Sequence, residues 1–226
     1  DHLQNSDWVA LTQRARIIYI AKNTNIININ YEDLASDDFK GRVCTRSGFH
    51  PYNISLFASL LHHHGEAWLK NYLTNLKKNL ARKPQGNDRD QVKAIAAGVC
   101  DFSLGNHYYY FNMLDNEDQK VWLDKVVPIF PNQDTQGAHV NISGVSIINK
   151  ATKAESLNFL RFLVSEEAQT IYASDNNEFP ASPSVSSSPK VEKLVGGAKF
   201  DIIDLFILAD NRKTVVSILN EINFDE

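Results

Sequence analysis

VCDFSLGNHYYY, residues 99–110, is the stretch that decides the fold class of this 226-residue chain. Its first half, residues 99–104, is an apolar run that predicts a buried parallel strand. Three consecutive tyrosines, Tyr108 to Tyr110, follow a predicted turn at Gly105-Asn106. A buried phenol needs a polar partner, and open α/β sheets bind ligands at the carboxyl ends of their strands. We therefore predict a ligand site with phenol oxygens at the end of this strand.

The tyrosine cluster indicates a metal ion. Phenolate is a hard oxygen donor and suits a hard, highly charged cation, Fe(III) above all. A phenol ordinarily loses its proton only near pH ~10, but a bound cation makes its ligands lose protons readily. The alternative is that Tyr108 and Tyr109 are aromatic filler, because neighbours in a regular strand point to opposite faces. Both can reach one ion only if the backbone leaves β geometry near Gly105-Asn106.

The surrounding sequence alternates between strand and helix patterns. Strands are predicted near residues 8–20, 41–45, 80–84 and 99–104, and helices near 51–61, 65–79 and 88–97. This βαβαβ order implies a parallel sheet with helices on both faces. The later part predicts a strand at 139–145, a long amphipathic helix at 154–173, a loop-rich segment at 176–189 and further helices at 206–222.

Three predicted strand ends carry polar residues: Ser47-Gly48, Gly86-Asn87, and Asn106 with its tyrosines. In a parallel sheet these ends fall on the same edge. Tyr52 lies in the first turn of the helix after Ser47, so its ring can reach the same crevice. Backbone amides at the start of that helix favour an anion. One edge of the sheet is thus predicted to offer both phenolates and an anion site.

Composition and charge narrow the class of protein. With 43% hydrophobic and 22% charged residues, the chain suits a soluble globular protein of one or two domains. A net charge of -4 without a strongly basic block argues against nucleic acid as the main partner. No apolar run is long enough for a transmembrane helix, so no membrane insertion is expected. No signal peptide is visible, and the start at Asp1 fits a mature secreted protein, a cytosolic protein or a fragment.

The remaining reactive residues do not indicate an enzyme. The sequence contains no Gly-x-Ser-x-Gly elbow, phosphate-binding loop or His-Glu-x-x-His motif. His62-His63-His64 lies at a helix end, where consecutive side chains diverge by about 100° and do not easily converge on one ion. Cys44 and Cys100 lie in apolar segments, and two interpretations stay open. They are either buried thiols or a disulfide between neighbouring strands, which requires an oxidising compartment.

Six segments in order carry a resemblance to a known family: LTQRAR at 11–16, FKGRV at 39–43, RSG and PYN within 46–53, ARKPQGND at 81–88, GNHYYY at 105–110 and NNEFP at 176–180. The chain resembles the periplasmic ferric-ion-binding proteins of bacterial iron ABC transporters over nearly its whole length. The resemblance implies the type II periplasmic-binding-protein fold. That is an α/β fold with a parallel-rich central sheet flanked by helices and divided into two lobes.

The same resemblance implies the site residues. Metal ligands are expected at Tyr52, Tyr108 and Tyr109, and Tyr110 is expected to pack. Arg14 matches the family arginine that can hold a synergistic carbonate. The positions where relatives hold an anion such as phosphate are matched by Ser47, Gly48, Asn87 and Asn106.

The function implied is capture of Fe(III) in the periplasm and delivery to an inner-membrane ABC permease, with no bond made or broken. A synergistic anion, carbonate or phosphate, would offset the charge of the ion. The alternative is a binding protein for an anion or other small solute that uses the same interlobe cleft without iron.

The resemblance also shapes the expected domain organisation. Family members begin with a segment that builds much of the first lobe, and this sequence starts at a point that matches the region near the hinge. We expect residues 10–135 to form the second lobe, 136–188 the remaining piece of the first lobe, and 189–226 C-terminal helices that pack back on the second lobe. Open strand edges in the incomplete first lobe would invite self-association.

Overall fold

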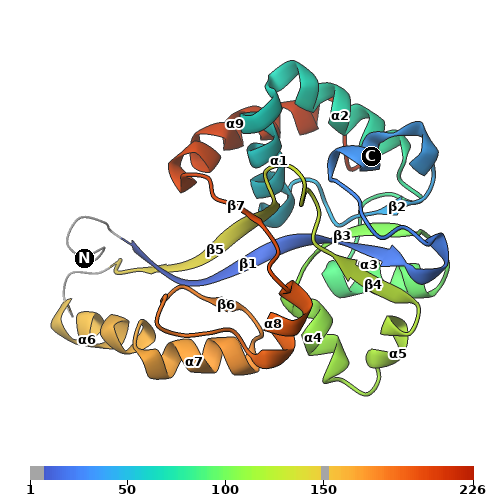
Figure 1. Ribbon diagram of the computed structural model, residues 1–226. Helices are drawn as coiled ribbons and strands as arrows, with labels where there is room; N and C mark the ends of the chain where they lie inside the picture. Colours follow the sequence, from blue (N-terminus) through green and yellow to red (C-terminus); the bar gives the residue numbers. More distant parts are fainter. Residues whose placement is uncertain (1–7, 149–152) are drawn as a thin grey trace. The chain divides into compact units, whose positions relative to one another are not determined.

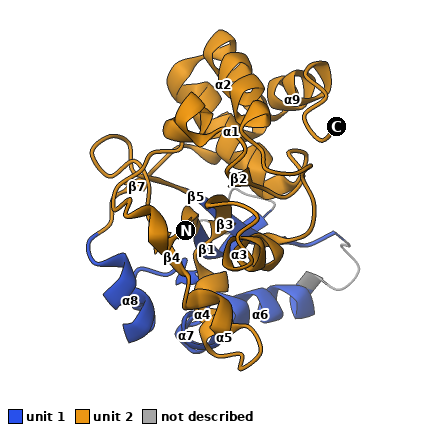
Figure 2. Cartoon of the chain, turned by 90° about the vertical axis from the view of Figure 1, so that its right-hand side faces the viewer, with its two compact units in different colours: residues 1–14, 140–197 blue, residues 15–139, 198–226 orange. Residues whose placement is uncertain are grey.

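The computed structural model describes residues 8–148 and 153–226, which fall into two compact units (Figure 2). Unit 1 comprises the residues up to 14 and residues 140–197, and unit 2 comprises residues 15–139 and 198–226. Strands β1 (Trp8–Ala21) and β5 (Ala138–Ser146), both labelled in Figure 1, each contain residues of both units. The predicted α/β class is confirmed, because strands and helices alternate along the chain.

Unit 2 is built on a mixed sheet. Strand β2 (Val43–Cys44) runs parallel to β3 (Phe102–Asn106), whereas β1 runs antiparallel to β3 and to β4 (Val126–Ile129). A second parallel pairing joins the start of β5 to β7 (Phe200–Asp201). Because β2 and β3 are parallel, their carboxyl ends lie at the same edge of the sheet, as predicted.

Helices pack around this sheet in unit 2. Helix α1 (Pro51–His64) contacts α2 (Glu66–Lys78) and α9 (Leu205–Glu221), and α3 (Asp88–Ala96) contacts β3. The shorter helices are η1 (Lys22–Thr24), η2 (Glu32–Ala35), η3 (Asp37–Phe39), α4 (Tyr108–Leu114) and α5 (Lys120–Leu123). The core between sheet and helices contains fully buried apolar side chains, among them Ile18, Val43, Phe57, Leu73 and Leu104.

Three details of the predicted unit 2 were wrong. Strand β1, expected to belong to a parallel sheet, runs antiparallel to β3 and β4. Strand β3 continues through Gly105 and Asn106, where a turn was expected, and α4 starts two residues later. Glycine is needed at 105 because a Cβ there would lie 2.3 Å from Cε2 of Tyr19 on β1. The strand expected at 80–84 is reduced to a single parallel bridge between Leu80 and Val43.

Unit 1 contains helices α6 (Lys153–Leu163), α7 (Glu166–Asp175) and α8 (Pro189–Val195) and the short strand β6 (Phe179–Pro180), which pairs with β1. The predicted helix at 154–173 is therefore two helices, and the hydroxyl of Ser165 caps the second by accepting from the Ala168 N–H. The buried amide of Gln169 joins three segments of the unit. It donates to the Leu11 carbonyl on β1 (2.8 Å) and accepts from the N–H of Ala181 (2.8 Å) after β6.

A membrane-spanning helix needs about 20 mostly apolar residues. Among the described residues, no helix combines sufficient length with sufficient apolar character to cross a bilayer.

Candidate metal-binding site

Three tyrosines from two helix starts gather in unit 2. Tyr52 lies in the first turn of α1, and Tyr108 and Tyr109 begin α4. The hydroxyl oxygens of Tyr52 and Tyr108 are 3.5 Å apart, and the rings of Tyr108 and Tyr109 have centres 4.3 Å apart. The structure therefore brings together the three side chains that the sequence predicts as ligands. Their role as ligands stays a prediction.

The backbone leaves β geometry between Asn106 and Tyr108, which is what the metal hypothesis requires. His107, buried and in the αR region, is the transition residue. Its N–H donates to the Ala15 carbonyl (3.0 Å), and its Nδ1 accepts from the Ala15 N–H (3.1 Å). This double contact to β1 holds the start of α4 against the sheet.

A histidine likewise fixes the start of α1. The side chain of His50 caps the helix, because its Nδ1 accepts from the Tyr52 N–H (3.2 Å). Burial, and next the nearby Arg46 guanidinium, lower the pKa of His50 to about 4. The imidazole is therefore neutral at pH 7 and can act as the acceptor.

A buried carboxylate ties the segments behind the tyrosines together. Asp88 is fully buried, and its Oδ2 accepts from Arg16 Nη1 (2.7 Å) and from the N–H of Asn106 (2.9 Å). Its other oxygen, Oδ1, accepts from Arg46 Nη1 (3.1 Å). Arg16 also donates to the amide oxygens of Asn53 (2.7 Å) and Asn106 (3.1 Å). Asp88 thus joins β1, the loop after β2, the end of β3 and the start of α3.

Three guanidinium groups lie over the tyrosine rings. Arg46 and Arg16 are 5.2 and 5.8 Å from the centre of the Tyr52 ring, and Arg89 is 5.2 Å from that of Tyr109. A cation over an aromatic face is attracted by the ring quadrupole. These contacts restrict the ring positions.

Tyr108 and Tyr109 hold their protons at neutral pH. Burial is the main cause that raises the pKa of Tyr108, and hydrogen bonding with Tyr109 and Tyr52 raises it further. Burial also raises the pKa of Tyr109, while its hydrogen bond with Tyr108 acts in the opposite direction. A metal ion that binds here must therefore displace protons from these oxygens.

The residues predicted to bind an anion have partners within the chain. The Ser47 hydroxyl and the Gly48 N–H both donate to the carboxylate of Asp225. Asn87 forms a capping box with Asp90 at the start of α3. Arg14 belongs to unit 1, where its guanidinium donates to the Ser143 hydroxyl. The predicted anion-binding role of these residues stays a prediction.

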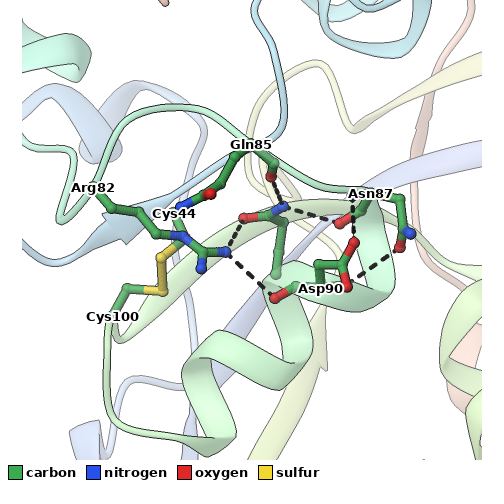
Figure 3. Close-up of a disulfide and its surroundings, with 7 residues drawn as sticks. Cys44, Arg82, Gln85, Asn87, Asp90 and Cys100 are labelled. Atoms are coloured by element: carbon green, nitrogen blue, oxygen red, sulfur yellow. Dashed lines mark hydrogen bonds between the residues drawn. A yellow bond between two sulfur atoms is a disulfide. The ribbon is translucent and has the colours of Figure 1, made fainter.

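The cysteines form a disulfide, Cys44–Cys100, which links β2 to the segment before β3. Figure 3 draws this bond together with Asn87 and Asp90 at the start of α3, which are hydrogen-bonded to each other. Of the two interpretations that the sequence left open, the disulfide is the correct one.

The three consecutive histidines do not converge on a common point. His63 contacts Asp201 (3.0 Å), and His64 contacts Glu32 (2.9 Å). Within the described ranges, no cluster of three or more His, Cys, Asp or Glu side chains could hold a metal ion. The tyrosine oxygens are therefore the candidate ligands.

Sequence reasoning missed Arg16, Arg46 and Asp88 as part of the site. Each lies within a segment that carried the family resemblance, one or two positions from a residue predicted to bind a ligand. For Arg16, the sequence predicted a place in the strand near residues 8–20 but no role in the site. No local pattern distinguishes a buried charged residue from an exposed one, so the pairing becomes visible only in the fold.

The fold and the site are those of a solute-binding protein. The chain belongs to the family of bacterial extracellular solute-binding proteins, whose family model matches residues 7–211. Solute-binding proteins are not enzymes, and the resemblance to ferric-ion-binding members is confirmed by the relatives.

Two curated relatives are Iron uptake proteins A2 and A1 of Synechocystis, 35% and 38% identical over 99% and 98% of this chain. The chain spans 67% and 63% of their lengths. Among solved structures, the apo ferric ion-binding protein A of Pasteurella haemolytica is 43% identical, with a TM-score of 0.94 over 99% of this chain and 71% of that one. A Trichodesmium protein in complex with iron and citrate is 35% identical, with a TM-score of 0.88 over 96% of this chain and 70% of that one.

Proposed function

We propose that this chain binds Fe(III) through the phenolate oxygens of Tyr52, Tyr108 and Tyr109 and delivers it to an inner-membrane ABC permease. The observation that carries the proposal is the gathering of these three phenols at two helix starts, with Tyr52 and Tyr108 oxygens 3.5 Å apart. Relatives named for ferric iron or iron uptake support the choice of ion. No bond is made or broken in this function.

The site works by exchange of protons for metal. Each ligating phenol gives up its proton when iron binds. Acidification or reopening of the site therefore allows the oxygens to bind protons again, and the ion is released. The arginines over Tyr52 and Tyr109 restrict the ring positions before iron arrives. Preorganised ligands lose less conformational entropy on binding.

The proposed place of action is the periplasm. The family description is extracellular, and the Cys44–Cys100 disulfide suits an oxidising compartment. We also propose that unit 2 corresponds to the second lobe expected from the sequence and unit 1 to the piece of the first lobe.

Buried nitrogens beside the tyrosines are available to donate hydrogen bonds to a synergistic anion. Within the described part of the chain, the buried side-chain nitrogens that make no hydrogen bond include Arg16 Nε, Arg46 Nε, Arg89 Nε and Asn106 Nδ2. Buried donors are costly without an acceptor, and an anion would supply one. The same observation favours the second candidate function, binding of an anion or small solute without iron.

Titration of the iron-free protein with ferric citrate tests the proposal. Phenolate-to-Fe(III) charge transfer absorbs visible light. A visible absorption band should therefore grow and saturate at a molar ratio of one iron per protein chain. The absence of such a band contradicts the iron function. Calorimetric binding of phosphate by the same iron-free sample, without any visible band after ferric citrate, would favour the second candidate.

A further inference from the structure

The turn between β2 and α1 already holds a carboxylate. The Ser47 hydroxyl donates to Oδ2 of Asp225 (2.5 Å), and the Gly48 N–H donates to Oδ1 (2.8 Å). Both donors lie just before α1, whose N-terminal end attracts negative charge. Two donors directed at the two oxygens of one carboxylate form the kind of site that binds an oxyanion.

Asp225 is delivered to this position by a packed turn after α9. The neighbouring Phe224 is fully buried against the Phe57 ring, with centres 6.1 Å apart. Gly48 makes room for Phe224, because a Cβ at residue 48 would lie 2.5 Å from Cδ1 of that ring. The ammonium of Lys77 donates to the carbonyls of Ile222 (3.0 Å) and Asn223. Apolar packing and backbone contacts thus hold the carboxylate in place independently of its own hydrogen bonds.

We infer that Asp225 determines anion specificity at this turn: its carboxylate is the resident anion of Ser47 and Gly48 and excludes free oxyanions such as phosphate. The inference extends the proposed function, since it decides which anion stands near the helix that carries Tyr52. It does not depend on iron, so it is tested on the iron-free protein. Failure of the iron titration and failure of the anion test are therefore separate results.

The variants distinguish two roles of Asp225: a carboxylate that keeps free anions out, and a side chain that only holds the turn together. Asp225→Ala removes both the group and the charge and should open the position to phosphate. Asp225→Asn keeps a group of the same shape, whose amide oxygen still accepts from the Gly48 N–H, so the position stays filled. Asp210→Ala, an exposed aspartate on α9, is the matched control.

The measurement is calorimetric titration of the iron-free full chain with inorganic phosphate at neutral pH. Asp225→Ala should bind phosphate at least about tenfold more tightly than wild type, Asp225→Asn and Asp210→Ala. Addition of Ser47→Ala to Asp225→Ala should remove the gain. No gain in folded Asp225→Ala, or a gain that survives Ser47→Ala, would overturn the inference.

A second measurement uses only the wild-type protein and does not depend on the folding of any variant. The amide resonance of Gly48 is followed by NMR during a phosphate titration. Because Asp225 occupies the N–H, the resonance should not move. A saturable shift of this resonance with phosphate would show that the carboxylate yields to a free anion and would overturn the inference.

Discussion

The guanidinium of Arg16 lies 2.7 Å from the carboxylate of Asp88, and the two side chains are 2% and 0% exposed. Arg46 contacts the other oxygen of the same carboxylate. One acidic side chain therefore balances two basic ones in the interior, directly behind Tyr52. Buried ion pairs contribute little over an apolar replacement, but the loss of one partner is costly because the other charge stays buried.

Asp88→Asn should therefore destabilise unit 2 strongly. Two guanidiniums would lose their negative partner, and the expected decrease in the free energy of unfolding is about 3–5 kcal/mol. Urea denaturation followed by circular dichroism measures it. Asp118→Asn, an exposed aspartate between α4 and α5, is the control and should leave the midpoint unchanged. Equal midpoints for the two variants would show that the Asp88 network does not stabilise the fold.

The disulfide should contribute measurably to stability. Cys44 and Cys100 are 56 residues apart, so the bond constrains a long loop of the unfolded chain. Replacement of both cysteines by serine should lower the free energy of unfolding by roughly 2–4 kcal/mol. Urea denaturation with and without reductant provides the comparison. In reductant, the unfolding midpoint of the wild type should approach that of the double variant. A wild-type midpoint that does not change with reductant contradicts the prediction.

Stability should fall on acidification because of His139. Burial, and next the charge of Arg16, lower the pKa of this imidazole from 6.5 to about 3, and its Nε2 contacts the Ser55 hydroxyl (2.8 Å). Between these values the unfolded chain binds a proton that the folded chain does not, so stability rises with pH. From pH 7 to pH 5 this group alone should remove about 2 kcal/mol.

The difference between variants isolates that contribution. His139→Gln should flatten the dependence of unfolding free energy on pH between 7 and 5. His62→Gln, on the exposed face of α1, should leave the dependence as in wild type. Parallel curves for wild type and His139→Gln would contradict the assignment.

Iron binding should release protons. The pKa of Tyr108 and that of Tyr109 are raised by burial, so both phenols are protonated at pH 7 before the metal arrives. Affinity should consequently decrease as the pH falls. Calorimetry of the same titration in two buffers of different ionisation enthalpy measures the net proton release. Heats that do not depend on the buffer would show that no phenol gives up its proton.

The edge of the sheet that carries the site follows from local sequence. Apolar strands near residues 43 and 102 and the helix that starts at Pro51 are short-range signals, and parallel strands necessarily end on one side. The length of β3 was not predictable in this way. Its extension through Gly105 depends on the Tyr19 ring of β1, whose hydroxyl donates to the Asn106 carbonyl (2.8 Å). That contact joins residues 87 positions apart.

The contacts of the charged residues around the site could not be predicted from the sequence for the same reason. Arg16 and Asp88 are 72 positions apart, and Ser47 and Asp225 are 178 positions apart. Neither helical nor strand periodicity relates such residues, and a carboxylate next to a helix start is usually a cap. Asn87 and Asp90 form such a cap, whereas Asp88 between them turns inward. Only the packed fold separates these roles.

The most direct test of the account compares single tyrosine variants in the ferric citrate titration. Tyr52→Phe, Tyr108→Phe and Tyr109→Phe each remove one phenol oxygen and leave the ring. Each should change the visible band and weaken iron binding by more than the roughly 10–100-fold that loss of an outer-shell partner costs. Tyr110→Phe, one residue further along α4, should match wild type. An unchanged band and affinity in the first three variants, or an equal loss in Tyr110→Phe, would contradict the claim that these phenols hold the ion.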